Sequence, residues 1–319
     1  MKAAVKIGCM GELLVEFVCS QKNGRHRKPA SYMGPFASGA PGIFIDQAAR
    51  VGGKAIFVGA VGNDAFGDVL LERLRRAGVE TRLINVVAGV PTGTAFVSYN
   101  DDGSRDFVYN IARSAASRLA AGETTLAGLA DFGLDDMHVS GSALGDADMA
   151  AKIVSVCQFL HARGVRISFD PNIRKELMGS PAYLQAVRTI IGLCTIFLPS
   201  QEDADVLFPG KDLEAFAEAL FISGVEHVVL KRGELGASGL AKTGERVDLP
   251  AHMVEVVDPT GAGDCFCATF VTLMASGVLD FGSAVARANA AGALAVGRLG
   301  PMEGNSSLAE IEAFLATRQ

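Results

Sequence analysis

The chain has 319 residues, of which 49% are hydrophobic and 20% charged, so it has enough apolar material for a large globular core. Its formal net charge is −6 and no basic stripe is present, which argues against a nucleic-acid partner. No segment approaches the roughly 20 apolar residues that a membrane span needs, and the six cysteines follow no zinc spacing. We therefore expect a cytoplasmic enzyme with reduced thiols.

Short β-branched apolar runs alternate with longer amphipathic patterns along most of the chain. The predicted strands span Val5–Met10, Ala55–Ala60, Met137–Ser140, Arg166–Asp170, Thr195–Leu198 and His227–Lys231. The predicted helices span Asp64–Ala77, Ala147–Arg163, Tyr183–Gly192 and Leu213–Ser223. This alternation predicts an α/β fold, a doubly wound and mostly parallel sheet with helices on both faces.

The N-terminal third contains strand-like pieces that no helix follows. Gly11–Val18 comes directly after the first strand, and Thr94–Tyr99 and Arg105–Tyr109 flank a turn-forming stretch typical of a hairpin. We expect these pieces, within about residues 11–37 and 90–112, to form a small β-sheet that acts as a lid over a ligand. An antiparallel extension of the main sheet is the alternative. Residues 1–319 are then one domain with a lid.

The predicted lid leaves strand edges free. Its pieces alternate between apolar and polar residues, and proteins seldom leave such edges unpaired. We therefore expect a homodimer in which the lids of two subunits meet.

The segment that carries the chemistry runs from Val256 to Phe266. A strand-like run ends in a Pro/Gly-rich turn, and a small-residue helix begins near Gly261 and continues to about Ser276. Gly261, Ala262 and Gly263 leave backbone N–H groups unpaired at a helix start, which suits an anion hole for a phosphoryl group in transfer. Asp264 can either complement the helix dipole or accept the proton of an attacking hydroxyl, and the adjacent anion hole favours the second role.

Other nucleotide-binding signatures are absent from the sequence. It contains neither a G-x-x-x-x-G-K-[ST] loop nor an H-R-D catalytic loop, which excludes P-loop enzymes and protein kinases. A G-x-G-x-x-G motif does not follow the first strand, which argues against a Rossmann dehydrogenase.

Several motifs resemble one family in their order along the chain. Asp258-Pro259-Thr260-Gly261-Ala262-Gly263-Asp264 resembles the C-terminal signature of the ribokinase-like (PfkB) carbohydrate kinases. Ser38–Pro41, with Gly52-Gly53 and Gly59–Gly67, resembles the N-terminal signature of that family. Phe169–Arg174 is similar to a segment of its fructokinase and 2-keto-3-deoxygluconate kinase branch.

The resemblance implies an ATP-dependent sugar kinase that uses Mg²⁺ and a monovalent cation such as K⁺. It implies Asp264 as general base and Gly261, Ala262 and Gly263 as anion hole. The residues implied at the nucleotide are Lys231, Gly233, Gly236, Asn289 and Ser200. Those implied at the sugar are Glu16, Gly39 and Arg174. Asp203, three residues after Ser200, is implied in an indirect role at Mg²⁺, and Asp258 and the Thr260 carbonyl in holding the monovalent cation.

Departures from the family pattern bear on the substrate. Ile43 stands where the family usually has a sugar-binding Asn, and Asp46 or Gln47 on the same helical face can replace it. Ile111 stands where acid-handling relatives carry an Arg, and Arg113 points the other way if this segment is extended.

The loss of that Arg favours a neutral ketohexose, such as tagatose or fructose, as acceptor. The alternative is 2-keto-3-deoxygluconate, bound through Arg105, Arg113 or Arg174. A nucleoside kinase of the same fold is a third interpretation. A non-catalytic sugar-binding protein is the alternative from another class, but it would not need the Gly261–Asp264 pattern.

Overall fold

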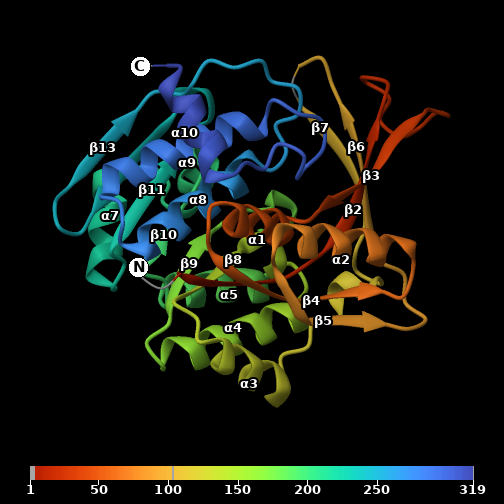
Figure 1. Ribbon diagram of the computed structural model, residues 1–319, viewed down its shortest axis with the longest axis horizontal. Helices are drawn as coiled ribbons and strands as arrows, with labels where there is room; N and C mark the ends of the chain where they lie inside the picture. The colour runs from red at the N-terminus through yellow and green to blue at the C-terminus, as the bar shows by residue number, and fades with distance from the viewer. Residues whose placement is uncertain (1–3, 103, 319) are drawn as a thin grey trace.

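The computed structural model describes residues 4–102 and 104–318. Within these ranges the chain forms a nine-stranded main sheet, in the order β13-β12-β11-β10-β9-β8-β1-β4-β5, and a separate four-stranded small sheet, in the order β3-β2-β6-β7 (Figure 1). The main-sheet strands are β1 (Lys6–Met10), β4 (Lys54–Gly62), β5 (Glu80–Val87), β8 (Asp136–Ser140), β9 (Arg166–Asp170), β10 (Ile196–Phe197), β11 (His227–Lys231), β12 (Ala237–Ala241) and β13 (Arg246–Leu249). The small-sheet strands are β2 (Leu14–Cys19), β3 (Tyr32–Ser38), β6 (Gly93–Tyr99) and β7 (Arg105–Asn110).

The helices cover both faces of the main sheet. They are α1 (Ala40–Arg50), α2 (Ala65–Ala77), α3 (Glu123–Phe132), α4 (Ala147–His161), α5 (Pro181–Ile191), α6 (Gln201–Leu207), α7 (Leu213–Ile222), α8 (Ala262–Ser276), α9 (Phe281–Ala295) and α10 (Leu308–Ala316). Short 3₁₀ turns lie at Ala115–Ser117, Gly141–Leu144, Lys175–Leu177 and Gly233–Leu235. None of the helices in the described part of the chain is long and apolar enough to cross a membrane.

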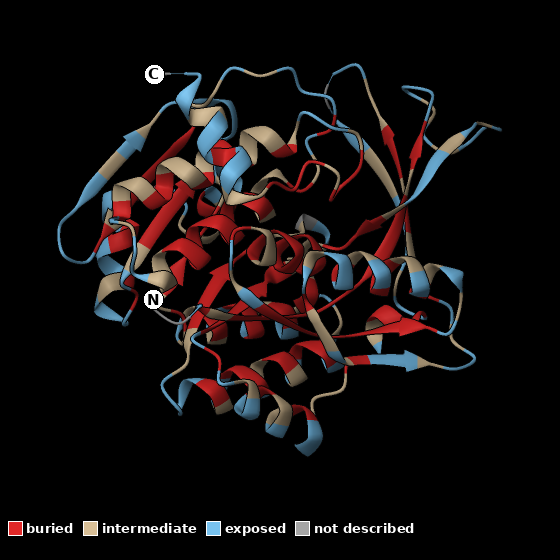
Figure 2. Ribbon diagram, viewed as in Figure 1, coloured by how far each residue is buried: buried red, intermediate tan, exposed pale blue. Residues whose placement is uncertain are grey.

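Two apolar cores sandwich the main sheet. One packs α1, α2, α8 and α9 against one face, through side chains such as Phe44, Leu70 and Phe270. The other packs α3, α4, α5 and α7 against the opposite face, through Leu129, Ile153 and Phe216 among others. Buried residues accordingly fill the central strands between two partly exposed helix layers (Figure 2). The predicted doubly wound α/β fold is confirmed.

The main sheet is parallel except at one edge. β1 pairs in parallel with both β4 and β8, so later strands are added first on one side of β1, as β4 and β5, and then on the other side, from β8 onwards. Such a reversal opens a crevice at the carboxyl ends of the strands, where open α/β sheets bind ligands. The hairpin β12–β13 adds antiparallel strands beyond β11 that the sequence analysis did not predict.

The small sheet contains the hairpin predicted from the turn-forming residues between β6 and β7, which pair antiparallel. β2 pairs in parallel with β6 and antiparallel with β3, a strand that was not predicted. The small sheet stands off the main sheet beside the carboxyl ends of its strands (Figure 1), so the alternative of an antiparallel extension of the main sheet is wrong.

Helix starts follow the local signals in the sequence. Asp64 caps α2 through the Gly67 N–H, and Asp146 and Asp212 cap α4 and α7 in the same way. The six cysteines are all buried and unbridged, as expected for reduced thiols, and Cys265 and Cys267 pack within α8.

Candidate active site

The N-terminus of α8 opens at the crevice edge. Gly261 is its N-cap and has a φ of 85°, in the region where only glycine is unstrained, and no side chain caps the first turn. The N–H groups of Ala262 and Gly263 therefore stay available to an anion, and the helix dipole favours negative charge there. The three residues predicted to form an anion hole thus lie at an uncapped helix start.

Asp264 lies in the first turn of α8 and is only partly exposed. Burial, and then the negative charge of Asp170, raise its pKa to about 8, while Lys231 and Arg174 act in the opposite direction. A carboxylate that titrates near neutral pH is well matched to take a proton from a hydroxyl group.

A buried ion pair adjoins the first turn of α8. Lys231 ends β11 and Asp170 ends β9, and Lys231 Nζ lies 2.5 Å from Asp170 Oδ2 and 3.4 Å from Cys267 Sγ. Burial lowers the pKa of Lys231, but Asp170 and Cys267 raise it overall above its usual value, so the ammonium is charged. Lys231 was predicted at the nucleotide, and its Nζ lies 3.5 Å from the point where a Cβ on Gly263 would stand.

Two buried carboxylates face the crevice, Glu12 from the β1–β2 connection and Glu16 from β2. Glu16, predicted to hold sugar hydroxyls, is 3% exposed, and its Oε2 accepts from Ser38 Oγ at 3.2 Å. Burial and then the charge of Asp258 raise its pKa to about 7, against the effects of Ser38 and Arg105. Glu12, which the sequence analysis did not single out, accepts from Ser142 Oγ at 2.7 Å across the β1/β8 reversal, and burial raises its pKa.

Each of these glutamates has one buried oxygen without a partner among the described residues, namely Oε2 of Glu12 and Oε1 of Glu16. Buried carboxylate oxygens normally accept hydrogen bonds, so each glutamate keeps one acceptor that no described residue uses. The signal that points to Glu12 is its place directly after Gly11, at the carboxyl end of the first strand.

Arg174 and Gly39 complete the predicted sugar side. Burial raises the pKa of Asp264, Glu12 and Tyr109, and the positive charge of nearby Arg174 opposes that rise in all three. Gly39 is the N-cap of α1, and a Cβ there would stand 2.6 Å from the Glu12 carbonyl oxygen. Both residues therefore border the same crevice as Asp264.

Asp258 is fully buried at the turn that leads into α8. Its Oδ1 accepts from the Thr260 N–H at 2.9 Å and from the Tyr99 hydroxyl of the small sheet, and its Oδ2 accepts from the Gly300 N–H at 2.9 Å. Arg105, also from the small sheet, donates to Thr260 Oγ1 at 3.2 Å. These contacts connect the small sheet to the turn that carries the anion hole.

The remaining predicted nucleotide residues lie at the adjoining edge. Gly233 and Gly236 form the turn between β11 and β12, and Asn289 in α9 donates to the Pro250 carbonyl at 2.8 Å. Ser200 caps α6 and shares a capping box with Asp203. Asp203 Oδ1 also accepts from the Ile173 N–H at 2.8 Å, which ties α6 to the segment before Arg174.

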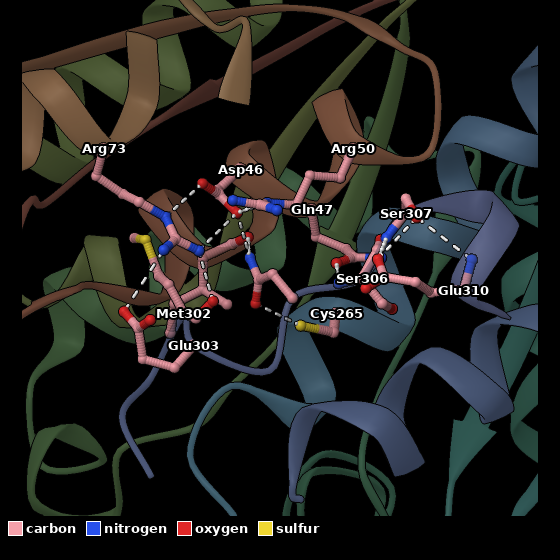
Figure 3. Close-up of polar contacts among 12 residues, drawn as sticks. Asp46, Gln47, Arg50, Arg73, Cys265, Met302, Glu303, Ser306, Ser307 and Glu310 are labelled. Carbon is pink, nitrogen blue, oxygen red and sulfur yellow. Dashed lines mark hydrogen bonds and ion pairs between the residues drawn. The ribbon is translucent and has the colours of Figure 1, made fainter. Parts of the chain in front are cut away.

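The structure corrects the interpretation of Ile43 and Asp46. The Ile43 side chain is buried against Gly261, beneath the anion hole. Asp46 is fully buried one helical turn further on, and its carboxylate is occupied by Arg50, Arg73 and Asn305 (Figure 3). Asp46 is therefore not available to a sugar, and Gln47 is likewise engaged by Thr269 and Ser306.

Comparisons with known proteins bear on the identity of this site. The family model described as pfkB family carbohydrate kinase matches residues 6–308. The chain is 30% identical to the 2-dehydro-3-deoxygluconokinase of Bacillus subtilis (strain 168), over 97% of this chain and 95% of that protein. It is 29% identical to "Probable fructokinase-3" of Arabidopsis thaliana, over 80% and 74% of the two chains.

Solved structures resemble the chain over nearly its full length. A protein from E. coli called "putative Ribokinase II", in complex with ATP and Mg²⁺, is 39% identical, with a TM-score of 0.92 over 98% of this chain and 99% of that one. A fructokinase double mutant from Vibrio cholerae O395, with fructose, ADP and potassium ion bound, is 25% identical, with a TM-score of 0.83 over 99% of both chains.

Proposed function

This chain belongs to the pfkB family of carbohydrate kinases and is an ATP-dependent sugar kinase, and we propose that its acceptor is a neutral ketohexose such as tagatose or fructose. The observation that carries the proposed site is the uncapped start of α8 beside Asp264, a carboxylate with a pKa of about 8. The sugar would lie against Glu12, Glu16 and Arg174, with the hydroxyl to be phosphorylated directed at Asp264.

In this proposal Asp264 accepts the proton of the attacking hydroxyl, while the N–H groups of Gly261, Ala262 and Gly263 hold the phosphoryl group in transfer. The ammonium of Lys231 and the guanidinium of Arg174 lie close enough to Asp264 to shift its pKa, so they also stabilise the negative charge of the transferred group. No covalent enzyme intermediate is required, because the acceptor oxygen bonds directly to the γ-phosphorus of ATP while the bond to the β-phosphate oxygen breaks and ADP leaves.

The residues present fit an indirect role at Mg²⁺, which in kinases neutralises the charge of the ATP phosphates. In the described part of the chain no group of three or more His, Cys, Asp or Glu is arranged to hold a metal ion. Both oxygens of Asp203 already accept hydrogen bonds, from Ile173 and Ser200. We therefore propose that Asp203 orients water around the metal rather than binding it directly.

The surroundings of Asp258 fit a monovalent cation. Its carboxylate is fully buried, its hydrogen-bond partners are neutral donors, and no Lys or Arg of the described ranges forms an ion pair with it. A buried charge of this kind normally has a counter-ion. We propose that K⁺ binds between Asp258 and the Thr260 carbonyl.

The choice of a neutral acceptor rests on Ile111. Ile111 and Tyr109 line a cavity of about 610 Å³ between the end of β7 and the start of α2, together with apolar side chains such as Phe66 and Pro91. Ile111 itself offers no cation to a carboxylate, so a sugar acid bound here would need another residue to pair with it. The apolar side chain at this position is our reason for preferring an uncharged acceptor.

One observation favours 2-keto-3-deoxygluconate as a second candidate. The chain turns at Ala112 and Arg113 instead of staying extended, because the Ser114 N–H bonds back to the Ile111 carbonyl at 2.9 Å. Arg113 consequently lines the same cavity as Ile111, contrary to the expectation for an extended segment. Its guanidinium is then the cation that would pair with the carboxylate of a sugar acid.

The test compares kcat/KM for tagatose, fructose and 2-keto-3-deoxygluconate in the wild type and in Arg113→Gln and Ile111→Arg. For a neutral acceptor we expect a ketohexose to be preferred, Arg113→Gln to change little, and Ile111→Arg to improve the sugar acid. A sugar acid preferred tenfold or more by the wild type, about 1.4 kcal/mol, together with a loss of that preference in Arg113→Gln, would establish the second candidate.

A further inference from the structure

Asp46 and Asn305, which are buried, join Arg50 and Arg73, which are partly exposed, in a polar cluster, here called the Asp46 cluster, that connects three parts of the fold. Figure 3 labels Asp46, Arg50 and Arg73. Arg50 Nε donates to Asp46 Oδ2 at 2.7 Å from the same helix, and Arg73 Nε donates to Asp46 Oδ1 at 2.8 Å from α2. Asn305 Nδ2 donates to Asp46 Oδ2 at 2.8 Å from the segment before α10. None of these side chains contacts the crevice in which the sugar is proposed to bind.

The two arginines of the cluster differ in reach. Arg73 also donates to the Met302 carbonyl at 2.6 Å and pairs with Glu303 at 3.5 Å. Arg50 makes no bond to residues 300–305 in the part of the chain that the structure describes. Arg73 thus clamps the turn at residues 300–305, whereas Arg50 only neutralises Asp46.

The turn at residues 300–305 contacts the segment that carries the anion hole. The Gly300 N–H donates to Asp258 Oδ2 at 2.9 Å. The Pro301 carbonyl oxygen abuts Gly261, only 2.4 Å from the point where a Cβ would stand on that glycine. The turn therefore contacts both Asp258 and Gly261, the two ends of the segment that leads into α8.

Asn305 connects the same turn to the residue after the proposed base. Its Nδ2 also donates to the Ile43 carbonyl at 3.2 Å, and its Oδ1 accepts from Cys265 Sγ at 3.0 Å. Cys265 follows Asp264, and the Ile43 side chain packs against Gly261. The Asp46 cluster thus contacts Cys265, which follows Asp264, and Ile43, which packs against Gly261, without touching Asp264 or the anion hole itself.

We propose that Arg73 and Asn305 are positioning residues that hold the anion hole and Asp264 in register through the turn at residues 300–305. A buried ion pair contributes little net stability compared with apolar residues of similar size. The role of the Asp46–Arg73 pair is therefore to hold the turn at residues 300–305 in one arrangement. Phosphoryl transfer depends on such geometry, because donors displaced by about 1 Å can cost about a hundredfold in rate.

The test uses steady-state kinetics and thermal unfolding of Arg73→Gln, Arg73→Lys and the matched control Arg50→Gln, with the sugar that the wild type turns over best. Arg73→Gln should lower kcat about tenfold to a hundredfold while the KM values for ATP and sugar change less than about threefold. Arg73→Lys should recover part of the loss, because lysine can still pair with Asp46. Arg50→Gln should keep kcat near that of the wild type at a similar or lower unfolding temperature.

The positioning role is overturned if Arg73→Gln and Arg50→Gln have the same kcat at comparable thermal stability, or if the Arg73 change appears in KM alone. Should Arg73→Gln fail to fold, an undiminished kcat in Arg73→Lys also overturns the positioning role. The inference rests on the proposed anion hole, so Gly263→Val is measured in parallel. Normal turnover in Gly263→Val refutes the anion hole itself, whereas an inactive Gly263→Val with a normal Arg73→Gln refutes only the positioning role.

Discussion

Replacement of Asp264 by asparagine separates proton removal from phosphate binding, since asparagine keeps the size of the side chain but cannot accept the proton. We expect kcat to fall about 10²–10⁴-fold, the range for loss of a positioned general base, which corresponds to about 3–5 kcal/mol. The KM for ATP should stay near the wild-type value, because the N–H groups at the start of α8 are unchanged.

The pH dependence follows from the raised pKa of Asp264. With a pKa of about 8, only about a tenth of the free enzyme carries the ionised base at pH 7. In the wild type kcat/KM should therefore rise about tenfold per pH unit up to about pH 8 and then level off. Glu16→Gln is the control, because it removes a group with a pKa of about 7 and should raise the KM for sugar while leaving the limb near pH 8 in place.

Asp264→Asn should raise the stability of the folded protein at high pH although it lowers activity. An unfolded Asp ionises near pH 4, whereas the folded protein disfavours the ionised form, so wild-type stability is full below pH 4 and is lost as the pH rises through about 8. The full rise in pKa would correspond to about 5 kcal/mol, and the partial exposure of the side chain reduces the expected difference to about 2–3 kcal/mol. Asp264→Asn should thus match the wild type at pH 4 and exceed its free energy of unfolding at pH 9.

The assays are a coupled measurement of ADP release between pH 5.5 and 9.5 and denaturant unfolding at pH 4 and pH 9. Wild-type turnover in Asp264→Asn would show that another group removes the proton. A variant that is inactive but also unfolded at pH 9 would contradict the electrostatic reasoning.

Three further predictions concern the surroundings of the base. Gly263→Val should fold, because a Cβ there meets only Lys231 Nζ at 3.5 Å, but it should lose turnover and hold ATP more weakly, as nucleotide titration would show; normal turnover would place the anion hole elsewhere. Asp258→Asn should make kcat insensitive to exchange of K⁺ for tetramethylammonium, whereas the wild type should lose activity in that exchange; equal sensitivity of both proteins would exclude Asp258 from the cation site. We also propose a homodimer joined through the small sheet, whose Met33, Val108 and Tyr109 are more than 40% exposed; a monomeric mass by light scattering across micromolar concentrations would contradict it.

Local patterns predict those parts of the fold that depend on neighbours in the chain. The helix from Gly261 to Ser276, the hairpin between Thr94 and Tyr109 and the strands Arg166–Asp170 and His227–Lys231 were predicted nearly at their observed bounds. Glycine and proline set their turns, and apolar periodicity sets their faces, whatever packs against them. β3 and the hairpin β12–β13 were missed, because β3 contains Gly34 and Pro35 and because β12 and β13 are only five and four residues long, so their strand character depends on pairing.

The sequence by itself determined the start of α8, with Asp264 next to a glycine-rich and uncapped first turn, because every group in that arrangement lies within seven consecutive residues. Only the tertiary structure decided which distant groups surround it. Lys231 on β11 meets Asp170 on β9 across the single strand β10, and Glu12 meets Ser142 at the point between β1 and β8 where the strand order reverses. Asp46 shows most clearly what could not be predicted from the sequence. Helical periodicity places it on the buried face of α1. Whether that face meets a sugar or the guanidinium of Arg73 depends on how α2 and residues 300–305 pack against it.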